Sequence, residues 1–329
     1  MGVVGGGALI TISGNYLGGA TSVTIGGELA TNLIVVSPTT ITAVTPTGTL
    51  GPVDVVVTTP AGTLTSLNGF SYVNIVAPAW ATLLEAAPDP TVVTDANLRA
   101  AIVASGFAWR IRDNSSNIEM LLVPGGTFMM GCSPGDAECG SDESPAHQVT
   151  LTNAFYMGKT EVTQAQWTAK MGNNPSYFSG QPNNPVDQVS WNMIQDFNSA
   201  TGLRLPTEAE WEYACRAGTT TARYGEVNAI AWYYQNWTIY GTQPVAGKLP
   251  NALGLYDTLG NVWEWCQDWY GPYSSGSVTN PTGPTTGTYR LLRGGGWVFG
   301  SISCRASQRW FLTPVNIYYY VGFRVVRTP

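Results

Sequence analysis

The chain has 329 residues, carries a net charge of −6 and has only 11% charged residues, against about 25% in typical soluble domains. The length predicts two or three domains, and the high Gly, Thr, Trp and Tyr content favours loop-rich β architecture over helical bundles or disorder. No Lys/Arg cluster is present, so we expect no nucleic-acid partner. No apolar run is long enough to span a bilayer, and no signal peptide is visible at the start.

The histidine and cysteine content limits the possible chemistry. His147 is the only histidine, which excludes a metal site built on several His ligands, and we expect it to be structural. The five cysteines are Cys132, Cys139, Cys215, Cys266 and Cys304, and none forms a CxxC pair. Cys132 and Cys139 flank the polar loop "CSPGDAEC", where they either close a disulfide or remain loop thiols.

Residues 1–73 read as short strands between Gly, Pro and Asn turns, with Val/Ile alternating with Thr/Ser. Seven or so strands in this length predict a small all-β sandwich. The phrases "ITISGNYLGGATSVTIGG", "TTITAVTP" and "VDVVVTTPAG" resemble the TIG/IPT immunoglobulin-like module. The resemblance implies an extracellular spacer or interaction domain.

Residues 74–118 are expected to form a connecting segment with one short helix. The phrase "TDANLRAAIVASG" offers Thr94 or Asp95 as the N-cap, apolar residues at helical spacing and Gly106 as the stop.

Residues 119–329 are expected to form an α+β domain with much irregular structure. Thr207 with Glu210 and Thr163 with Gln166 have the spacing of capping boxes, and the two helices should end at Gly218 and Gly172. Ser190 should cap a third helix. Loops as long as those between these helices need metals, disulfides or side-chain networks to hold them.

The phrases "GKTEVTQAQW", "RLPTEAEWEYACRAG", "NALGLYDTLGNVWEWCQDW" and "LLRGGGW" occur in the order typical of the formylglycine-generating enzyme (sulfatase-modifying factor) family. The resemblance covers nearly all of residues 119–327 and implies a decorated C-type-lectin-like fold. Enzymatic members oxidise a sulfatase cysteine and use two cysteines near the C-terminus that together hold copper. The matching stretch "GGGWVFGSISCRASQR" contains only Cys304, and Phe299 stands where the first cysteine is expected. One sulfur cannot make a two-thiolate copper site, so we expect no oxidase chemistry.

The resemblance also implies a disulfide and a metal site. Segments around Cys215 and Cys304 are neighbours in the implied fold, which predicts a Cys215–Cys304 disulfide; the alternative is two buried thiols. The calcium site of the family maps onto Asp257, Gly260, Val262 and Glu264 in "YDTLGNVWEW". Carboxylate and carbonyl oxygens suit Ca²⁺, which we expect as a structural ion. The alternative is that both acidic side chains accept hydrogen bonds from backbone amides.

The C-terminal region 294–324 is similar to the variable region of diversity-generating retroelement proteins, which use the same fold. In that frame three windows are expected to vary and to bind ligand: Val298, Phe299, Gly300, Ser301, Ser303, Trp310, Phe311, Leu312, Val315, Ile317, Tyr318, Tyr319 and Tyr320. Mutated adenines in asparagine codons never give Lys, Glu, Gln or Met, and none of these occurs in the windows. Trp310 is not reachable from such a codon and would be scaffold or need another template codon. We expect Trp297 and Phe323 to be core.

Three functions remain open. We favour a non-catalytic, receptor- or adhesin-like protein that binds a protein or glycan with this ring-rich surface, because Tyr, Phe and Trp dominate binding hot spots. The alternatives are an oxidase of the formylglycine-generating type and a sulfatase-interacting paralogue. The first function predicts an extracellular, cell-surface or virion-surface location.

Overall fold

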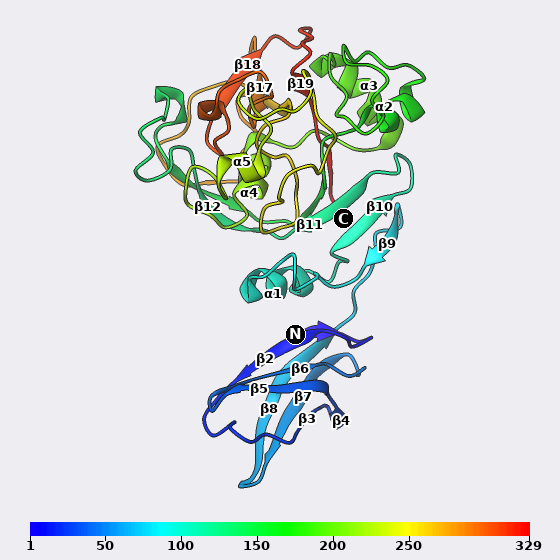
Figure 1. Cartoon of the computed structure of the whole chain (residues 1–329), viewed down its shortest axis with the longest axis vertical. Helices are drawn as coiled ribbons and strands as arrows, with labels where there is room; N and C mark the ends of the chain where they lie inside the picture. The colour runs from blue at the N-terminus through cyan, green and yellow to red at the C-terminus, as the bar shows by residue number, and fades with distance from the viewer. The chain divides into compact units, whose positions relative to one another are not determined.

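A computed structural model describes all residues, 1–329, as two compact units. The first contains residues 1–79 and 83–111, and the second contains residues 80–82 and 112–329 (Figure 1). Strands β9 (Ala81–Glu85) and β10 (Arg110–Asp113) span the points in the sequence where the chain passes between the units. The assignment of residues 74–118 as a connecting segment stays a prediction.

The first unit begins with the predicted β-sandwich. One sheet has the order β1-β8-β7-β3-β4 and the other β2-β6-β5. The strands are β1 (Gly2–Val3), β2 (Leu9–Ser13), β3 (Ser22–Ile25), β4 (Glu28–Leu29), β5 (Thr31–Ser37), β6 (Thr40–Val44), β7 (Gly51–Thr59) and β8 (Gly62–Val73). In β3 and β6, alternate residues such as Val23, Ile25 and Ile41 are fully buried, because successive side chains of a strand point to opposite faces.

Helix α1 (Ala96–Ala104) follows in the first unit, and Asp95 is its N-cap, with Oδ1 accepting from Leu98 N at 2.7 Å. This settles the choice between Thr94 and Asp95.

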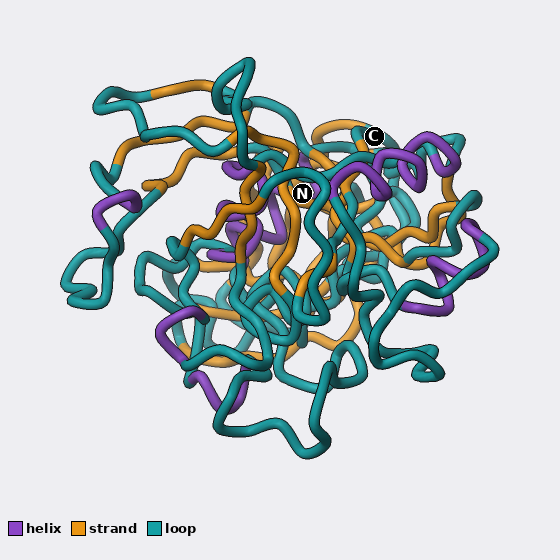
Figure 2. Tube along the Cα trace, turned by 90° about the horizontal axis from the view of Figure 1, so that it is seen from above, coloured by secondary structure: helices purple, strands orange, loops and turns teal.

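Three further sheets are formed mainly by residues of the second unit. The first has the order β20-β14-β11-β10-β9, the second β12-β13-β16 and the third β18-β17-β15-β19. The strands not yet bounded are β11 (Glu119–Val123), β12 (Gly126–Met130), β13 (His147–Leu151), β14 (Phe155–Gly158), β15 (Trp263–Trp269), β16 (Val278–Thr279), β17 (Arg290–Arg293), β18 (Arg309–Leu312), β19 (Val321–Gly322) and β20 (Val326–Arg327). Long loops connect them, as Figure 2 shows.

The helices of this unit begin where the sequence predicts. Thr163 starts α2 (Gln164–Met171) and Thr207 starts α4 (Glu208–Arg216), each with a complete capping box. Ser190 caps α3 (Trp191–Thr201). The C-cap of α4 is Ala217, one residue before the expected Gly218, in the left-handed conformation with φ 47°. The short elements are α5 (Val227–Ile230), η1 (Ser141–Glu143) and η2 (Ser301–Ser303).

Four buried arginines hold the C-terminal segment onto the rest of the unit. Arg305 pairs with Glu143 through two 2.7 Å hydrogen bonds and with Asp136 at 3.0 Å. Both Arg293 and Arg309 donate to Glu208, at 3.2 Å and 2.7 Å, and Arg293 also pairs with Glu212. Arg324 donates to both oxygens of Glu264, at 2.6 and 2.7 Å. We call these four side chains the arginine frame.

Loss of one member of the arginine frame should strongly destabilise this unit, because it leaves buried carboxylates with one counter-ion fewer. Arg293→Met should lower the free energy of unfolding by about 3–5 kcal/mol, because it leaves Glu208 and Glu212 buried with fewer partners. Arg112→Met, which breaks the partly exposed pair with Glu119, should cost about 1 kcal/mol or less. Urea unfolding of both variants measures the difference, and equal costs would contradict a structural role for the buried pair.

Candidate functional site

The region 294–324 directly follows β17 and contains η2, β18 and β19. Two arginines hold the backbone of the η2 turn. Arg305 Nε donates to the Ile302 carbonyl at 2.9 Å. Arg223 donates to the carbonyls of Ser301 at 2.8 Å and Cys304 at 2.9 Å. These bonds are made to main-chain carbonyls, so they do not depend on which side chains the turn carries.

Most side chains of the predicted variable windows reach solvent. Trp310, Phe311, Val315 and Ile317 are exposed, with 45% of Trp310 accessible. The partly exposed ones are Val298, Phe299, Gly300, Ser301, Leu312, Tyr318, Tyr319 and Tyr320. Trp297 and Phe323 are fully buried, as expected.

The structure corrects the windows at two positions. Ser303 is buried, and its hydroxyl donates to the Gly300 carbonyl within the η2 turn at 2.8 Å, so it faces the protein and not a ligand. Ile302, which the windows skipped as a site residue, is 51% exposed.

The exposed rings form a continuous layer over the buried Trp263. The Trp263 ring centroid lies 5.9 Å from that of Phe299 and 6.2 Å from that of Trp310. Phe299 contacts Tyr320 at 5.1 Å, and Tyr318 stacks on Tyr320 at the same distance. Offset and edge-on contacts of this kind stabilise the rings while leaving part of each face accessible.

Two loops outside the C-terminal region extend this layer, and sequence reasoning missed both. Tyr177 contacts Tyr319 with centroids 5.6 Å apart, and Tyr240 contacts Trp297 at 4.9 Å. The amide of Tyr234 donates to the Phe299 carbonyl at 2.9 Å. These three tyrosines are each about 60% exposed. The signal was present in the ring-rich polar phrases "NNPSYFSG" and "AWYYQNWTIYG".

We define the aromatic surface as these rings together. It contains Phe299, Trp310, Phe311, Tyr318, Tyr319 and Tyr320 from the C-terminal region, and Tyr177, Tyr234 and Tyr240 from the two loops. None of its members carries a charge at neutral pH. The surface can therefore supply apolar contact and tyrosine hydroxyls.

Asp187 and its neighbour Gln188 connect the loop of Tyr177 to the C-terminal region. Asp187 is fully buried; Oδ1 accepts from the Tyr177 amide at 2.8 Å, while Oδ2 has no hydrogen-bond partner. The next residue, Gln188, donates its amide to the Tyr318 carbonyl at 3.1 Å. Burial raises the pKa of the Asp187 carboxyl to about 7.

The predicted Cys215–Cys304 disulfide is wrong. Both are free thiols within one apolar cluster, and the disulfide joins Cys132 and Cys139 instead. Burial raises the pKa of each free thiol to about 12, so the thiolate that disulfide exchange requires is scarce. The Cys132–Cys139 loop has a clear role, since its Asp136 holds Arg305 and its Glu138 accepts from Arg223 at 3.0 Å.

The expected calcium ligands lie at a buried acidic cluster. Asp257 and Glu264 are joined there by Glu161, which sequence reasoning missed, and the three carboxylates interact electrostatically. Oδ1 of Asp257 and both oxygens of Glu161 have no partner. Desolvation and the neighbouring carboxylates raise the pKa of Glu161 well above its ordinary value. Glu264 instead accepts from Arg324 and from Trp211 Nε1 at 2.7 Å.

The backbone of this cluster turns through Asp257, Gly260 and Asn261, all with positive φ. The alternative, hydrogen bonds from backbone amides, accounts for only one of these oxygens, since the Ala246 amide donates to Asp257 Oδ2. The remaining buried oxygens without a partner suit a hard cation.

A second acidic group is unsuited to a metal. Asp136, Cys139 and Glu143 place their side-chain atoms within 4.8 Å of one another. Cys139 is in the disulfide, however, and both carboxylates pair with Arg305. The guanidinium already supplies the positive charge at this position.

Comparison with protein families identifies both parts of the chain. Residues 107–329 match the sulfatase-modifying factor enzyme 1-like domain, and residues 1–72 match the IPT/TIG domain. The chain therefore belongs to the sulfatase-modifying factor enzyme 1-like family, as the sequence motifs indicated.

Curated relatives include enzymes. The formylglycine-generating enzyme of Streptomyces coelicolor is 30% identical over 296 residues, covering 68% of this chain and 93% of that protein. The serine/threonine-protein kinase pkn1 of Chlamydia pneumoniae is 33% identical, and the match covers 64% of this chain but 38% of that protein.

Solved structures confirm the predicted C-type-lectin-like fold and the likeness to variable proteins. Treponema denticola variable protein 1 is 29% identical with a TM-score of 0.58, covering 64% of this chain and 95% of that one. PvdO from Pseudomonas aeruginosa is 25% identical with a TM-score of 0.61, covering 67% and 98%.

The raised pKa of Asp187 gives a pH-dependent prediction. The folded state holds this proton more tightly than the unfolded chain, so the contribution to stability is complete below about pH 4 and is lost as pH rises through about 7. Asp187→Asn keeps an acceptor for the Tyr177 amide but cannot ionise. Its melting temperature should exceed that of the parent at pH 8 and lose the advantage at pH 4. Asp196→Asn, an exposed site on α3, is the control, and parallel curves for parent and Asp187→Asn would contradict the assignment.

Proposed function

We propose that this protein is a non-catalytic ligand-binding protein that presents the aromatic surface, as a diversified site, to a protein or glycan partner. The observation that carries the proposal is the exposure of many uncharged rings on a backbone held by the arginine frame. Large aromatic contacts give high binding energy at low conformational-entropy cost, and a held backbone loses little further entropy on binding.

The arrangement favours diversification of this surface. Trp310, Val315 and Ile317 are exposed, whereas Arg309, which precedes Trp310, is buried and paired with Glu208. Variable side chains and structural side chains are thus different residues of the same segment. The likeness to Treponema denticola variable protein 1 supports a variable surface on this fold.

The chemistry at Cys304 argues against the oxidase alternative that the enzymatic relatives raise. The Cys304 thiol is fully buried, its pKa is raised to about 12 by burial, and its carbonyl and amide lie in the η2 turn. Phe299 stands where the first cysteine of the family is expected, and its ring packs on Trp263 and Tyr320. A sulfatase-interacting paralogue remains the second non-catalytic candidate, since it shares the family fold.

Location and cofactor complete the proposal. None of the helices is long and apolar enough to cross a membrane. A surface-displayed or extracellular location suits both a TIG module and a ligand-binding head. Calcium would be held by Asp257 with the main-chain carbonyls of Gly260 and Val262, and Glu161 and Glu264 would supply further negative charge. When bound, the ion would neutralise this charge and fix the turn.

Exposed positions of the variable windows should be nearly neutral for folding. Val315→Ser and Ile317→Ser should each change the free energy of unfolding by about 0.5 kcal/mol or less. Trp310→Ser also loses the ring contacts with Trp263 and Phe311 and should cost about 1 kcal/mol. Trp297→Ala, in the same segment but fully buried, should cost about 3–5 kcal/mol. A display library randomised at the three exposed positions should yield folded, specific binders to unrelated proteins. Copper-dependent oxidation of a sulfatase-type cysteine peptide by the parent chain would refute the non-catalytic assignment.

Calcium should stabilise the second unit. At about one hundred times the dissociation constant it should add roughly 2.7 kcal/mol, which chelation removes. Asp257→Asn and Glu161→Gln should abolish this increment, while the calcium-free variants keep at least the parent's stability because a buried charge is gone. Glu138→Gln, at an exposed carboxylate, should keep the full increment. An unchanged melting temperature of the parent with and without calcium would contradict the site.

A further inference from the structure

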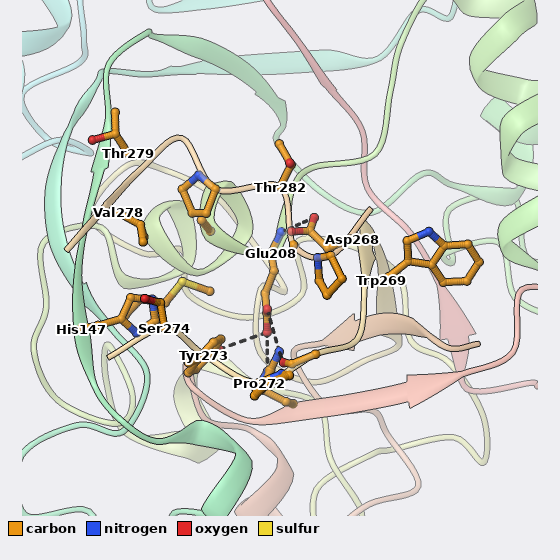
Figure 3. Close-up of a pocket in the computed structure, with 17 residues that line it drawn as sticks. His147, Glu208, Asp268, Trp269, Pro272, Tyr273, Ser274, Val278, Thr279 and Thr282 are labelled. Carbon is orange, nitrogen blue, oxygen red and sulfur yellow. Dashed lines mark hydrogen bonds and ion pairs between the residues drawn. The ribbon is translucent and has the colours of Figure 1, made fainter. Parts of the chain in front are cut away.

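A second candidate site shares no residue with the aromatic surface, although its Arg309 directly precedes Trp310 in β18. It is a pocket of 460 Å³ between the sheet containing β13 and β16 and the segment that follows β15, shown in Figure 3. This volume is within the range of about 300–1,000 Å³ typical of small-molecule sites. Its apolar walls come from Met130, Trp269, Pro272, Val278, Pro281 and Pro284.

The charges at the floor of the pocket are mostly compensated. Glu208, the first residue of α4, accepts hydrogen bonds from Arg309 Nε at 2.7 Å and from the Tyr273 hydroxyl at 3.1 Å. Arg293 approaches the same carboxylate from behind, at 3.2 Å. Glu208 and Arg309 therefore present no net charge to a ligand.

Asp268 is the exception among the buried acids of the pocket. Its side chain is 4% exposed and makes no ion pair, and Oδ2 accepts from the Glu208 amide at 2.9 Å. Burial, and then the neighbouring Glu208 carboxylate, raise the pKa of Asp268 to about 8. At neutral pH the protonated carboxyl can both donate and accept hydrogen bonds.

Other polar groups complete the lining. His147 Nδ1 lies 3.1 Å from the Pro145 carbonyl, which only accepts, so Nδ1 carries the hydrogen. In this tautomer Nε2 is the ring nitrogen that can accept a hydrogen bond. Ser274, Thr279 and Thr282 place hydroxyl-bearing side chains at the pocket, as Figure 3 shows.

We propose that this pocket binds a neutral, hydroxyl-rich small molecule of monosaccharide size. Hydroxyl groups donate and accept, as do Asp268 and the Ser and Thr side chains, and His147 adds an acceptor. The C–H faces of a sugar ring suit the proline and tryptophan walls. The aromatic surface would bind its own partner independently of this site.

A charged ligand fits the pocket less well. An anion would approach the carboxyls of Asp268 and Glu208, and a cation would approach the guanidinium of Arg309. Neither charge would gain a full counter-ion, because Arg309 and Glu208 already satisfy each other.

The test uses the full chain and saturation-transfer NMR with glucose, galactose, mannose and N-acetylglucosamine. Glucosamine and glucuronate, which have the same ring but carry a positive and a negative charge, serve as charged controls and are called the charged matches. We expect at least one neutral sugar to bind with a millimolar dissociation constant and to bind more tightly than either charged match. No neutral binding at about 10 mM, or tighter binding of a charged match, would overturn the proposal.

Two matched variants locate the binding. Ser274→Phe fills the pocket from an exposed position and should weaken sugar binding at least tenfold. Ser275→Phe introduces the same ring one residue along, outside the lining, and should leave binding unchanged. Asp268→Ala should weaken binding roughly tenfold, with melting curves recorded to check that it folds. Equal affinity of the two phenylalanine variants would place any sugar binding elsewhere and refute the site.

Discussion

The structure of the second unit depends on buried arginine–carboxylate pairs. Arg293, Arg305, Arg309 and Arg324 all lie within the last forty residues, and each reaches a buried Glu on another element. A buried pair of this kind adds little net stability over an apolar pair, but losing one partner is costly. The pairs therefore select one path for a segment with few regular elements, because any other path would leave charges buried and unpaired.

That constraint explains how rings can be exposed on a stable protein. In β18, Arg309 is buried while the adjacent Trp310 and Phe311 reach solvent. The η2 turn is likewise held through its carbonyls by Arg305 and Arg223. Since these hydrogen bonds and ion pairs involve backbone and arginine atoms, the exposed side chains between them are not needed to hold the backbone. The proposed diversified site would therefore change its chemistry without refolding.

Much of this was predictable from local sequence. Capping boxes placed α2 and α4, period-2 alternation placed the first sandwich, and long motifs placed the family fold. The cysteine pairing was not, because Cys215 and Cys304 share an apolar cluster without bonding. Tyr177, Tyr240 and Glu161 were missed for a related reason: each acquires its role from contacts with residues distant in sequence, which no local pattern reports.

The buried acids separate into two groups, and the separation carries functional meaning. Glu143 and Glu208, like Glu212 and Glu264, pair with the arginine frame, and Asp113 pairs with Arg327. Glu161, Asp187, Asp257 and Asp268 have no arginine partner, and burial raises the pKa of each carboxyl. A buried carboxyl without an ion pair costs stability. Such a carboxyl is therefore expected where a bound ion or ligand supplies the missing interaction. These four acids lie at the proposed calcium site, beneath the aromatic surface and in the pocket, which are the places where the proposals assign an ion or a partner.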